Sequence, residues 1–272
     1  MTSLFFRKEV FPILNHEALR AAMGALPWDG ELHLLSSVDS TNNRAKLLAR
    51  QGAPHGTAIL AEEQTAGRGR LGRSFTSPKG LGLYATFLLR PGLPPEQLLH
   101  VTAMAAVAAC RAVEATGWPS PRIKWTNDLL LGGKKLGGVL AEFSSGALIL
   151  GVGINVHHRP EDFPPDLAGL AASLRSESGS SPSRTDLAIH LMEELFRLSE
   201  GILSQKTAYL RQYEDLCLTI GRDILLHRNG ERIPARCTGL DENGSLLVRY
   251  ADGREETIFS GDVSVRGINS YV

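Results

Sequence analysis

The segment between Gln64 and Lys79 carries four cations and no carboxylate. Three glycines alternate with the arginines in the run GRGRLGR, residues 67–73. Glycine lets backbone N–H groups converge on one point, and guanidinium groups offer planar pairs of donors to phosphate oxygens. These residue types at this spacing predict a loop that binds an anion such as a triphosphate. The alternative, a solvated cationic loop, leaves the mutual repulsion of these side chains uncompensated.

The same run matches two other nucleotide-binding patterns, and both fail on context. GRGRLG has the GxGxxG spacing of a dinucleotide-binding turn, and GRGRLGRS approximates a P-loop, but each pattern requires a helix directly after the glycines. The residues that follow, 74–87, contain a proline and then a predicted strand. The sequence therefore predicts neither a dinucleotide-binding turn nor a P-loop in this segment.

A second group of chemically competent residues lies in KWTND, residues 124–128. Lys124 and Asp128 are four residues apart, and an extended segment would project both side chains to one face. Lys135 follows shortly afterwards, just before the pair Gly137–Gly138. Glycines weaken a strand unless another chain or a ligand approaches closely, so we expect an apolar ligand tail against this backbone. A surface hairpin joined by salt bridges is the alternative.

Two weaker signals follow in the chain. GVGIN, residues 151–155, ends a predicted strand with two glycines and an asparagine, which suits a wall of the same groove. His157 and His158 are adjacent, and adjacent residues on a strand point to opposite faces, so they form a poor metal-binding pair. We expect them to be loop histidines without a bound ion, and no metal site is predicted.

A sheet with flanking helices must position these groups. Strands are expected at ELHLLSS, TAILAEE, GLYATFLL, RIKW, DLLL, KLGGVLAEF and ALILGVGINV, the last four as an antiparallel meander. Helices are expected over 15–26, from Ser40 as N-cap to residue 51, and over 95–116, 184–203 and 205–213. The stretch 159–183, rich in Pro, Gly and Ser, is predicted to be a long loop.

The pattern changes after Leu216 to short strands at regular spacing: RDILLHR, RIPARCTGLD, SLLVRYA and REETIFS. They are separated by Asn229–Gly230, Asn243–Gly244 and Asp252–Gly253, dipeptides that favour tight hairpin turns. This pattern predicts a small β-barrel, which is near the lower limit for independent stability and should lean on the preceding domain. We therefore divide the chain into a catalytic domain of residues 1–215, with an N-terminal extension of residues 1–30, and a barrel of residues 216–272.

The composition excludes several classes of protein. The 272 residues contain 29 Lys and Arg and 29 Asp and Glu, so no overall field attracts nucleic acid or an anionic membrane, and anion binding must be local. No signal peptide or long charge-free apolar stretch is evident, which predicts a cytoplasmic protein without a membrane span. Cys110, Cys217 and Cys237 are scattered and form no CxxC pair, so buried thiols are expected rather than a disulfide framework or zinc site.

From about residue 30 the chain resembles the biotin protein ligases. The matching pieces, in order, are DSTNNRA, AEEQTAGRGRLGRSF, KWTNDLLLGGKKLGGVLAEF, GVGIN, GLDENGSLLVRYADG and SGDVSVR. The resemblance implies an α+β fold, with a mixed, largely antiparallel sheet and flanking helices like those of class II synthetases, followed by an SH3-like β-barrel. It also implies an ATP-dependent ligase that forms biotinyl-5'-AMP, with Mg²⁺ accompanying ATP, and transfers biotin to a lysine of a biotin carboxyl carrier domain such as that of acetyl-CoA carboxylase.

The resemblance assigns roles to individual residues. Biotin would be bound by Ser40, Thr41, Asn42, Gln64, Arg68, Gly69, Arg70, Lys135, Gly138 and Gly153. ATP and the adenylate would be bound by Gly67, Arg68, Gly69, Arg70, Arg73, Trp125, Asn127, Lys135 and Asn155. The catalytic residues would be Arg70, Lys135, Asp128 and Lys124: Lys135 meets the carboxylate and α-phosphate, and Asp128 orients or deprotonates the incoming lysine.

Some members of this family carry an N-terminal winged helix that binds DNA. Here only about 38 residues precede Asp39, which suffices for one short helix, so no DNA partner is expected. Homodimerisation is left open. Two alternative functions are a lipoate or octanoyl ligase or transferase of the same fold, which has no evident use for GRGRLGR, and a non-catalytic nucleotide-binding regulator. Zero net charge and the lack of a recognition helix disfavour a DNA-binding regulator.

Overall fold

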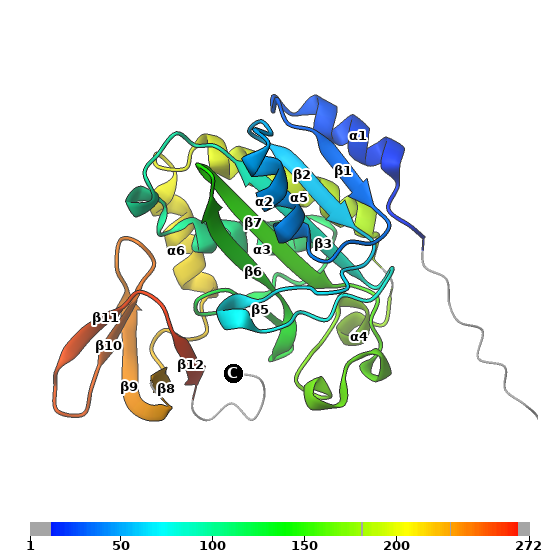
Figure 1. Ribbon diagram of the computed structural model, residues 1–272. Helices are drawn as coiled ribbons and strands as arrows, with labels where there is room; N and C mark the ends of the chain where they lie inside the picture. Colours follow the sequence, from blue (N-terminus) through cyan, green and yellow to red (C-terminus); the bar gives the residue numbers. More distant parts are fainter. Residues whose placement is uncertain (1–11, 181, 229, 266–272) are drawn as a thin grey trace, which may run out of the picture.

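The computed structural model describes residues 12–180, 182–228 and 230–265, and its main body is a seven-stranded sheet (Figure 1). The strands are β1 (Leu32–Leu35), β2 (Thr57–Ala61), β3 (Gly82–Leu89), β4 (Arg122–Lys124), β5 (Asp128–Leu131), β6 (Lys134–Ser144) and β7 (Ala147–Asn155). They lie in the order β1-β2-β3-β7-β6-β5-β4, with β1 parallel to β2 and the other neighbours antiparallel. The predicted α+β class with a mixed, largely antiparallel sheet is confirmed.

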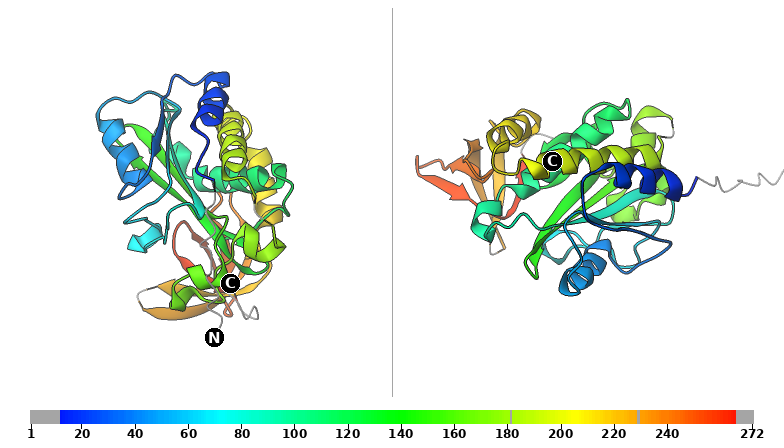
Figure 2. Two further views of the ribbon diagram at one scale, coloured as in Figure 1. Left: turned by 90° about the vertical axis from the view of Figure 1, so that its right-hand side faces the viewer. Right: turned by 90° about the horizontal axis from the view of Figure 1, so that it is seen from above.

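Helices cover both faces of this sheet. They are α1 (His16–Ala25), α2 (Thr41–Arg50), α3 (Val101–Ala115), α4 (Leu174–Ser178), α5 (Arg184–Glu200) and α6 (Lys206–Leu216). Figure 2 shows α2 on one face and α1, α3 and α5 on the other. All eight residues of β3 are buried, as expected for a central strand with both faces covered.

The sequence predicts one continuous helix over the apolar stretch 95–116. A short 3₁₀ turn, Pro95–Leu98, instead precedes α3. By length and composition alone this segment could cross a membrane, but most of it is buried inside the protein. It packs against α5, α6 and the sheet, which explains why it is apolar nearly all round.

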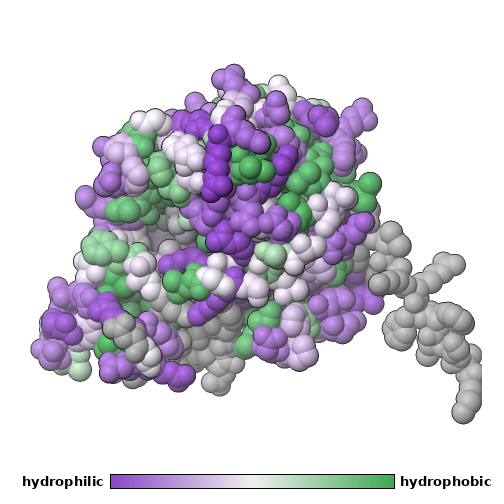
Figure 3. All heavy atoms as spheres, in the orientation of Figure 1, coloured by the Kyte–Doolittle hydropathy of each residue, from purple (hydrophilic) through white to green (hydrophobic). Residues whose placement is uncertain are grey.

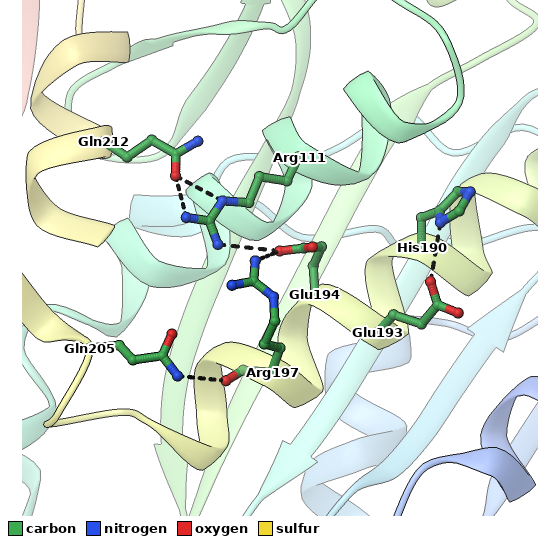
Figure 4. Close-up of polar contacts among 7 residues, drawn as sticks. All are labelled: Arg111, His190, Glu193, Glu194, Arg197, Gln205 and Gln212. Carbon is green, nitrogen blue, oxygen red and sulfur yellow. Dashed lines mark hydrogen bonds and ion pairs between the residues drawn. The ribbon is translucent and has the colours of Figure 1, made fainter. Parts of the chain in front are cut away.

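Polar contacts also tie the helical layer together (Figure 4). Arg111 of α3 donates to Gln212 of α6, with Nε 2.8 Å from Oε1, and its Nη1 lies 3.3 Å from a carboxylate oxygen of Glu194 on α5. The same carboxylate oxygen accepts from Arg197. Helix α3 thus shares one hydrogen-bonded cluster with α5 and α6, which follow it much later in the sequence. On the opposite face of the sheet, hydrophilic residues dominate the surface over α2 (Figure 3).

The C-terminal unit is a five-stranded antiparallel sheet. Its strands are β8 (Asp223–Arg228), β9 (Glu231–Leu240), β10 (Leu246–Arg249), β11 (Glu255–Ile258) and β12 (Asp262–Val265), in the order β11-β10-β9-β8-β12. Gly244 and Gly253 have φ of 78° and 85°, as the predicted turns require, whereas Asn229 lies outside the described residues. The sequence missed β12, because this four-residue strand pairs with the distant β8 and carries little local signal. The boundary after residue 215 remains a prediction.

The stretch 159–183 is not the plain loop that was expected. It contains 3₁₀ turns at Pro160–Asp162 and Pro165–Leu167, followed by α4. Ser173 caps α4 by accepting a hydrogen bond from the Ser176 backbone N–H at 2.9 Å. Ala171 forms a parallel bridge with Lys135, so the segment is held against the start of β6.

A buried ion pair fastens the N-terminal segment to the sheet. Arg184, the first residue of α5, lies 2.8 Å from a carboxylate oxygen of Glu62. The other carboxylate oxygen of Glu62 accepts from the backbone N–H of Leu14 at 2.7 Å, and Arg184 donates to the Pro12 carbonyl at 2.8 Å. Both charged side chains therefore stabilise the entry into α1.

We expect Arg184→Met to lower the free energy of unfolding by about 3–5 kcal/mol, because it leaves the Glu62 carboxylate buried without its partner. Urea unfolding followed by far-UV circular dichroism measures this loss. The control is Arg236→Met, because the Arg236–Asp223 pair is mostly exposed and should contribute less than about 1 kcal/mol. Equal losses in the two variants would contradict the assigned importance of the buried pair.

Candidate active site

A cavity of about 320 Å³ lies where the start of α2, the arginine loop (residues 64–79), the β4–β5 turn and strands β6 and β7 meet. This volume suits a small-molecule ligand. Nearly all of the residues singled out from the sequence line it: Ser40, Thr41, Asn42, Gln64, Arg68, Gly69, Arg70, Arg73, Lys124, Trp125, Asn127, Asp128, Lys135, Gly138, Gly153 and Asn155. The structure thus brings together segments that are more than 100 residues apart.

Gly67 is the exception, since it does not line the cavity. Its carbonyl accepts from the Phe75 backbone N–H at 2.8 Å, and a Cβ at this position would lie 2.3 Å from the Phe75 carbonyl oxygen. The glycine is needed because the arginine loop folds back on itself here. A direct contact of Gly67 with ATP remains a prediction.

Hydroxyl and amide groups form one end of the cavity. Ser40 is the N-cap residue of α2, as predicted, but its side chain makes no capping hydrogen bond. Gln64 supplies the cap instead, because its Oε1 accepts from the backbone N–H of Thr41 at 2.9 Å and from the Thr41 hydroxyl at 3.0 Å. Ser40 is buried and lines the cavity, and its hydroxyl does not serve the helix as a cap.

Asn42 is seated at this end by groups that the sequence did not single out. Thr86 on β3 donates to Asn42 Oδ1 at 2.7 Å. Asn42 Nδ2 donates to the Leu140 carbonyl at 3.3 Å and to Glu142 Oε2 at 3.0 Å. The sequence predicts that Thr86 lies in a strand, but only the packing of α2 over the sheet shows that its hydrogen-bond partner is Asn42.

The glycines of β7 make room for side chains of the protein itself. A Cβ on Gly151 would lie 2.1 Å from Asn42 Oδ1, and one on Gly153 would lie 2.6 Å from the ring of Phe75. The sequence interpretation assigned Gly151 and Gly153 to a wall of the groove. Both glycines line the cavity, but the groups that require them here are Asn42 and the arginine loop.

Cationic groups dominate the other end of the cavity. Lys135 Nζ lies 2.7 Å from Asp128 Oδ1, and Arg70 Nη1 donates to Asn127 Oδ1 at 3.2 Å. The buried Lys124 lines the same end. Among the described lining residues, this end holds these three cations and one carboxylate, that of Asp128, so the local charge is positive and suits an anionic ligand.

The sequence interpretation treated KWTND as an extended segment, but the structure shows that it is not extended. Lys124 ends β4, Asp128 begins β5, and the three residues between them form a turn. Lys124 and Asp128 are nevertheless cross-strand partners, so they share a face. The expected proximity holds, but hairpin register rather than strand periodicity causes it.

Distant segments hold this turn in place. The backbone N–H of Trp125 donates to the Thr219 hydroxyl at 3.1 Å, and its indole Nε1 donates to the Gly244 carbonyl at 3.0 Å. The Tyr213 hydroxyl donates to the carbonyl of Thr126 at 2.8 Å. Helix α6 and the C-terminal sheet therefore support a wall of the cavity.

The arginine loop finds a carboxylate outside its own sequence. The segment contains no anion, but Arg68 Nη1 lies 3.4 Å from Glu142 Oε1 on β6 and donates to Asn43 Oδ1 at 3.0 Å. The segment itself has no anion, as its sequence shows, and the carboxylate that pairs with Arg68 comes from β6. The missed partner is 74 positions away in the sequence, where no local pattern could reveal it.

An apolar wall was also missed. Phe163, Leu167, Leu170 and Ala171 line the cavity, and their spacing of three or four residues within a Pro-rich stretch is the signal that could have indicated it. His158 stacks on Phe163 with ring centroids 4.9 Å apart. Burial lowers the pKa of His158 to about 4, so this histidine is a neutral support. In the described residues, no three His, Cys, Asp or Glu side chains are grouped as metal ligands.

Both parts of the chain match known protein families. Residues 34–158 match the biotin/lipoate A/B protein ligase family, and residues 219–266 match the biotin protein ligase C-terminal domain. A biotin--[acetyl-CoA-carboxylase] ligase of Mycobacterium tuberculosis is 30% identical over 94% of this chain and 97% of its own length. The bifunctional ligase/repressor BirA of Bacillus subtilis is 32% identical over 84% of this chain and 72% of its own length.

A solved structure has the same fold. It is the biotin protein ligase from Aquifex aeolicus in complex with biotin and ATP, which is 33% identical and covers 87% of this chain and 98% of its own. The TM-score is 0.74. The fold and both matched sequence segments thus agree with one family.

Proposed function

The chain belongs to the biotin protein ligase family, and we propose that it forms biotinyl-5'-AMP from biotin and ATP and transfers biotin to a carrier lysine. Its relatives' names indicate acetyl-CoA carboxylase as the source of the carrier. The observation that best supports this function is a single cavity with hydroxyl and amide groups at one end and cations at the other. Biotin has the matching polarity, since a neutral ureido ring and an anionic carboxylate lie at opposite ends of an apolar chain.

The polar end suits the ureido ring. A ureido group has two N–H donors and one carbonyl acceptor, which hydroxyl and amide side chains can pair. We assign Ser40, Thr41, Asn42 and Gln64 to this group. The Ser40 hydroxyl is the most direct candidate, because it lines the cavity and makes no capping bond.

The cationic end suits adenylate formation. A biotin carboxylate oxygen attacks the α-phosphorus of ATP, the bond to the β-phosphate oxygen breaks, and pyrophosphate leaves. Both reactants are anionic, so repulsion between them is the main obstacle, and prearranged cations reduce it. We assign Lys135 and Arg70 to this task, with Lys124, Trp125, Asn127 and Asn155 around the nucleotide.

Transfer requires a neutral amine. The carrier lysine attacks the carbonyl carbon of the mixed anhydride, the bond to the phosphate oxygen breaks, and AMP leaves. The attacking nitrogen must lose a proton, and Asp128 is the only carboxylate among the cavity-lining residues described. We therefore propose that Asp128 accepts the proton that the attacking nitrogen loses.

Mg²⁺ is proposed to enter as the ATP complex. The carboxylate of Asp128 is already paired with Lys135, so phosphate oxygens and water would supply most of the ligands of the ion, as Mg²⁺ prefers. EDTA should abolish pyrophosphate release, and added Mg²⁺ should restore it. The midpoint of thermal unfolding without ATP should not change with EDTA, and a fall in that midpoint would instead indicate a resident structural metal.

The activity is tested by incubating the purified protein with ATP and biotin and measuring AMP and pyrophosphate. We expect release with biotin and not with lipoate, and avidin blotting should detect a biotinylated carrier domain. Pyrophosphate release with lipoate instead would favour the lipoate ligases that share the family model. We propose the cytoplasm as the compartment, since it supplies ATP and keeps buried thiols such as Cys110, Cys217 and Cys237 reduced.

A further inference from the structure

Glu142 contacts two residues that line different parts of the cavity, Asn42 and Arg68, although its sequence context does not mark it. It is on β6, two and four residues beyond Leu140 and Gly138, so it shares their face of the sheet. Gly138 and Leu140 line the cavity, while Glu142 lies just outside the lining. Its carboxylate therefore contacts groups of the cavity from behind rather than a ligand.

The first contact controls the amide of Asn42. Glu142 Oε2 and the Leu140 carbonyl accept the two N–H bonds of Asn42 Nδ2, at 3.0 and 3.3 Å. Asn42 Oδ1 accepts from the Thr86 hydroxyl at 2.7 Å on the opposite side. A carboxylate can only accept, so the amide cannot rotate by 180° without losing both interactions.

The second contact docks the arginine loop. Glu142 Oε1 lies 3.4 Å from Arg68 Nη1. Arg68 also donates to Asn43 Oδ1, and Asn43 Nδ2 in turn donates to Asp39 Oδ2 at 2.7 Å. Arg68, which lines the cavity, is thus held by residues of α2 and β6.

Lys46 completes the group without lining the cavity. Its Nζ lies 2.5 Å from Glu142 Oε1, so two cations face this one carboxylate. Burial raises the pKa of Glu142, but the hydrogen bonds from Asn42 and Lys46 outweigh it and hold the pKa below its ordinary value. The carboxylate is therefore ionised at neutral pH and acts as an acceptor.

We propose that Glu142 is a positioning residue that links the biotin end of the cavity to the arginine loop: one carboxylate oxygen orients Asn42 and the other docks Arg68. This inference rests on the proposed function, because it takes the Asn42 end as the site of the ureido ring. Binding of biotin beside Asn42 and docking of the arginine loop then depend on the same side chain.

The decisive comparison is Glu142→Gln against Glu194→Gln. Glu194 is a matched control, since its side chain is 22% exposed against 20% for Glu142 and it too contacts two cations, but it lies in the helical layer (Figure 4). Glu142→Gln should raise the biotin KM at least about tenfold, as expected for losing a charged hydrogen-bond partner, and change the ATP KM less than about threefold. Glu194→Gln should leave both constants within about twofold of wild type.

Hydrogen exchange tests the link to the loop independently of turnover. Glu142→Gln should speed amide exchange in residues 64–79 several-fold, because docking at Arg68 is weakened. In an Arg68→Met background the same substitution should add no further acceleration, since the partner is already gone. Additive acceleration, or acceleration equal to that of Glu194→Gln, would show that Glu142 has only a general structural effect.

The outcomes separate this inference from the proposed function. A wild-type protein that releases no pyrophosphate from biotin and ATP removes the function, and the inference with it. An active wild type with an unchanged biotin KM in Glu142→Gln removes the inference alone. If Glu142→Gln fails to fold, Arg68→Met provides the test. This variant should speed amide exchange in residues 64–79 several-fold. An exchange rate equal to that of the wild type would overturn the docking role.

Discussion

Lys135→Met is expected to slow adenylate formation by at least about a hundredfold, which is typical for removing one prearranged charge donor from an active site. The ammonium of Lys135 lies at the cationic end of the cavity, 2.7 Å from Asp128 Oδ1. Methionine keeps most of the apolar stem but cannot neutralise the carboxylate or the α-phosphate. Biotin should also bind more weakly, because its carboxylate loses a partner.

The fold should survive this change. The backbone of Lys135 exchanges hydrogen bonds with Leu170 and Ala172, each at 2.8 Å, and these bonds do not involve the side chain. The matched control is Lys134→Met, because the Lys134 ammonium pairs with Glu177 at 3.1 Å and does not line the cavity. Single-turnover release of pyrophosphate at saturating substrates measures the effect, and equal rates in the two variants would remove Lys135 from the mechanism.

Asp128→Asn should divide the two half-reactions. If Asp128 accepts a proton from the carrier lysine, the variant should still release pyrophosphate but should transfer biotin about a hundredfold more slowly, since a neutral amide cannot take up the proton. The contact with Lys135 raises a second interpretation, in which Asp128 only positions that ammonium. Loss of adenylate formation to the same degree as transfer would support this second role.

Preformed biotinyl adenylate separates the two interpretations. A transfer defect seen with the adenylate supplied directly cannot arise from ATP handling. Normal transfer in that experiment would exclude Asp128 as the proton acceptor. The control is the rate of biotin transfer by the wild type at the same pH, because the fraction of neutral carrier lysine changes with pH.

The local structure around the site was largely predictable, with clear reasons for each error. Short runs rich in apolar residues identified β2, β3, β6 and β7, and the Gly-containing turns identified Gly244 and Gly253, because these signals depend on residues close in sequence. The segment 159–183 and strand β12 were missed for the converse reason. Their order comes from pairing with Lys135 and with β8, which no local pattern encodes.

The chemistry of the site was determined by the sequence itself. Arginines between glycines supply donors that suit an anion, and Lys135 and Asp128 supply an amine and a carboxyl group to the site that they join. The tertiary structure decided which groups act together. Lys124 and Asp128 meet through hairpin register, Gln64 caps α2 in place of Ser40, and Glu142 holds both Asn42 and Arg68. The physical reason is range: a charge or a turn preference belongs to a residue and its neighbours, whereas a hydrogen bond of about 3 Å between residues 100 positions apart exists only after the helix has packed on the sheet.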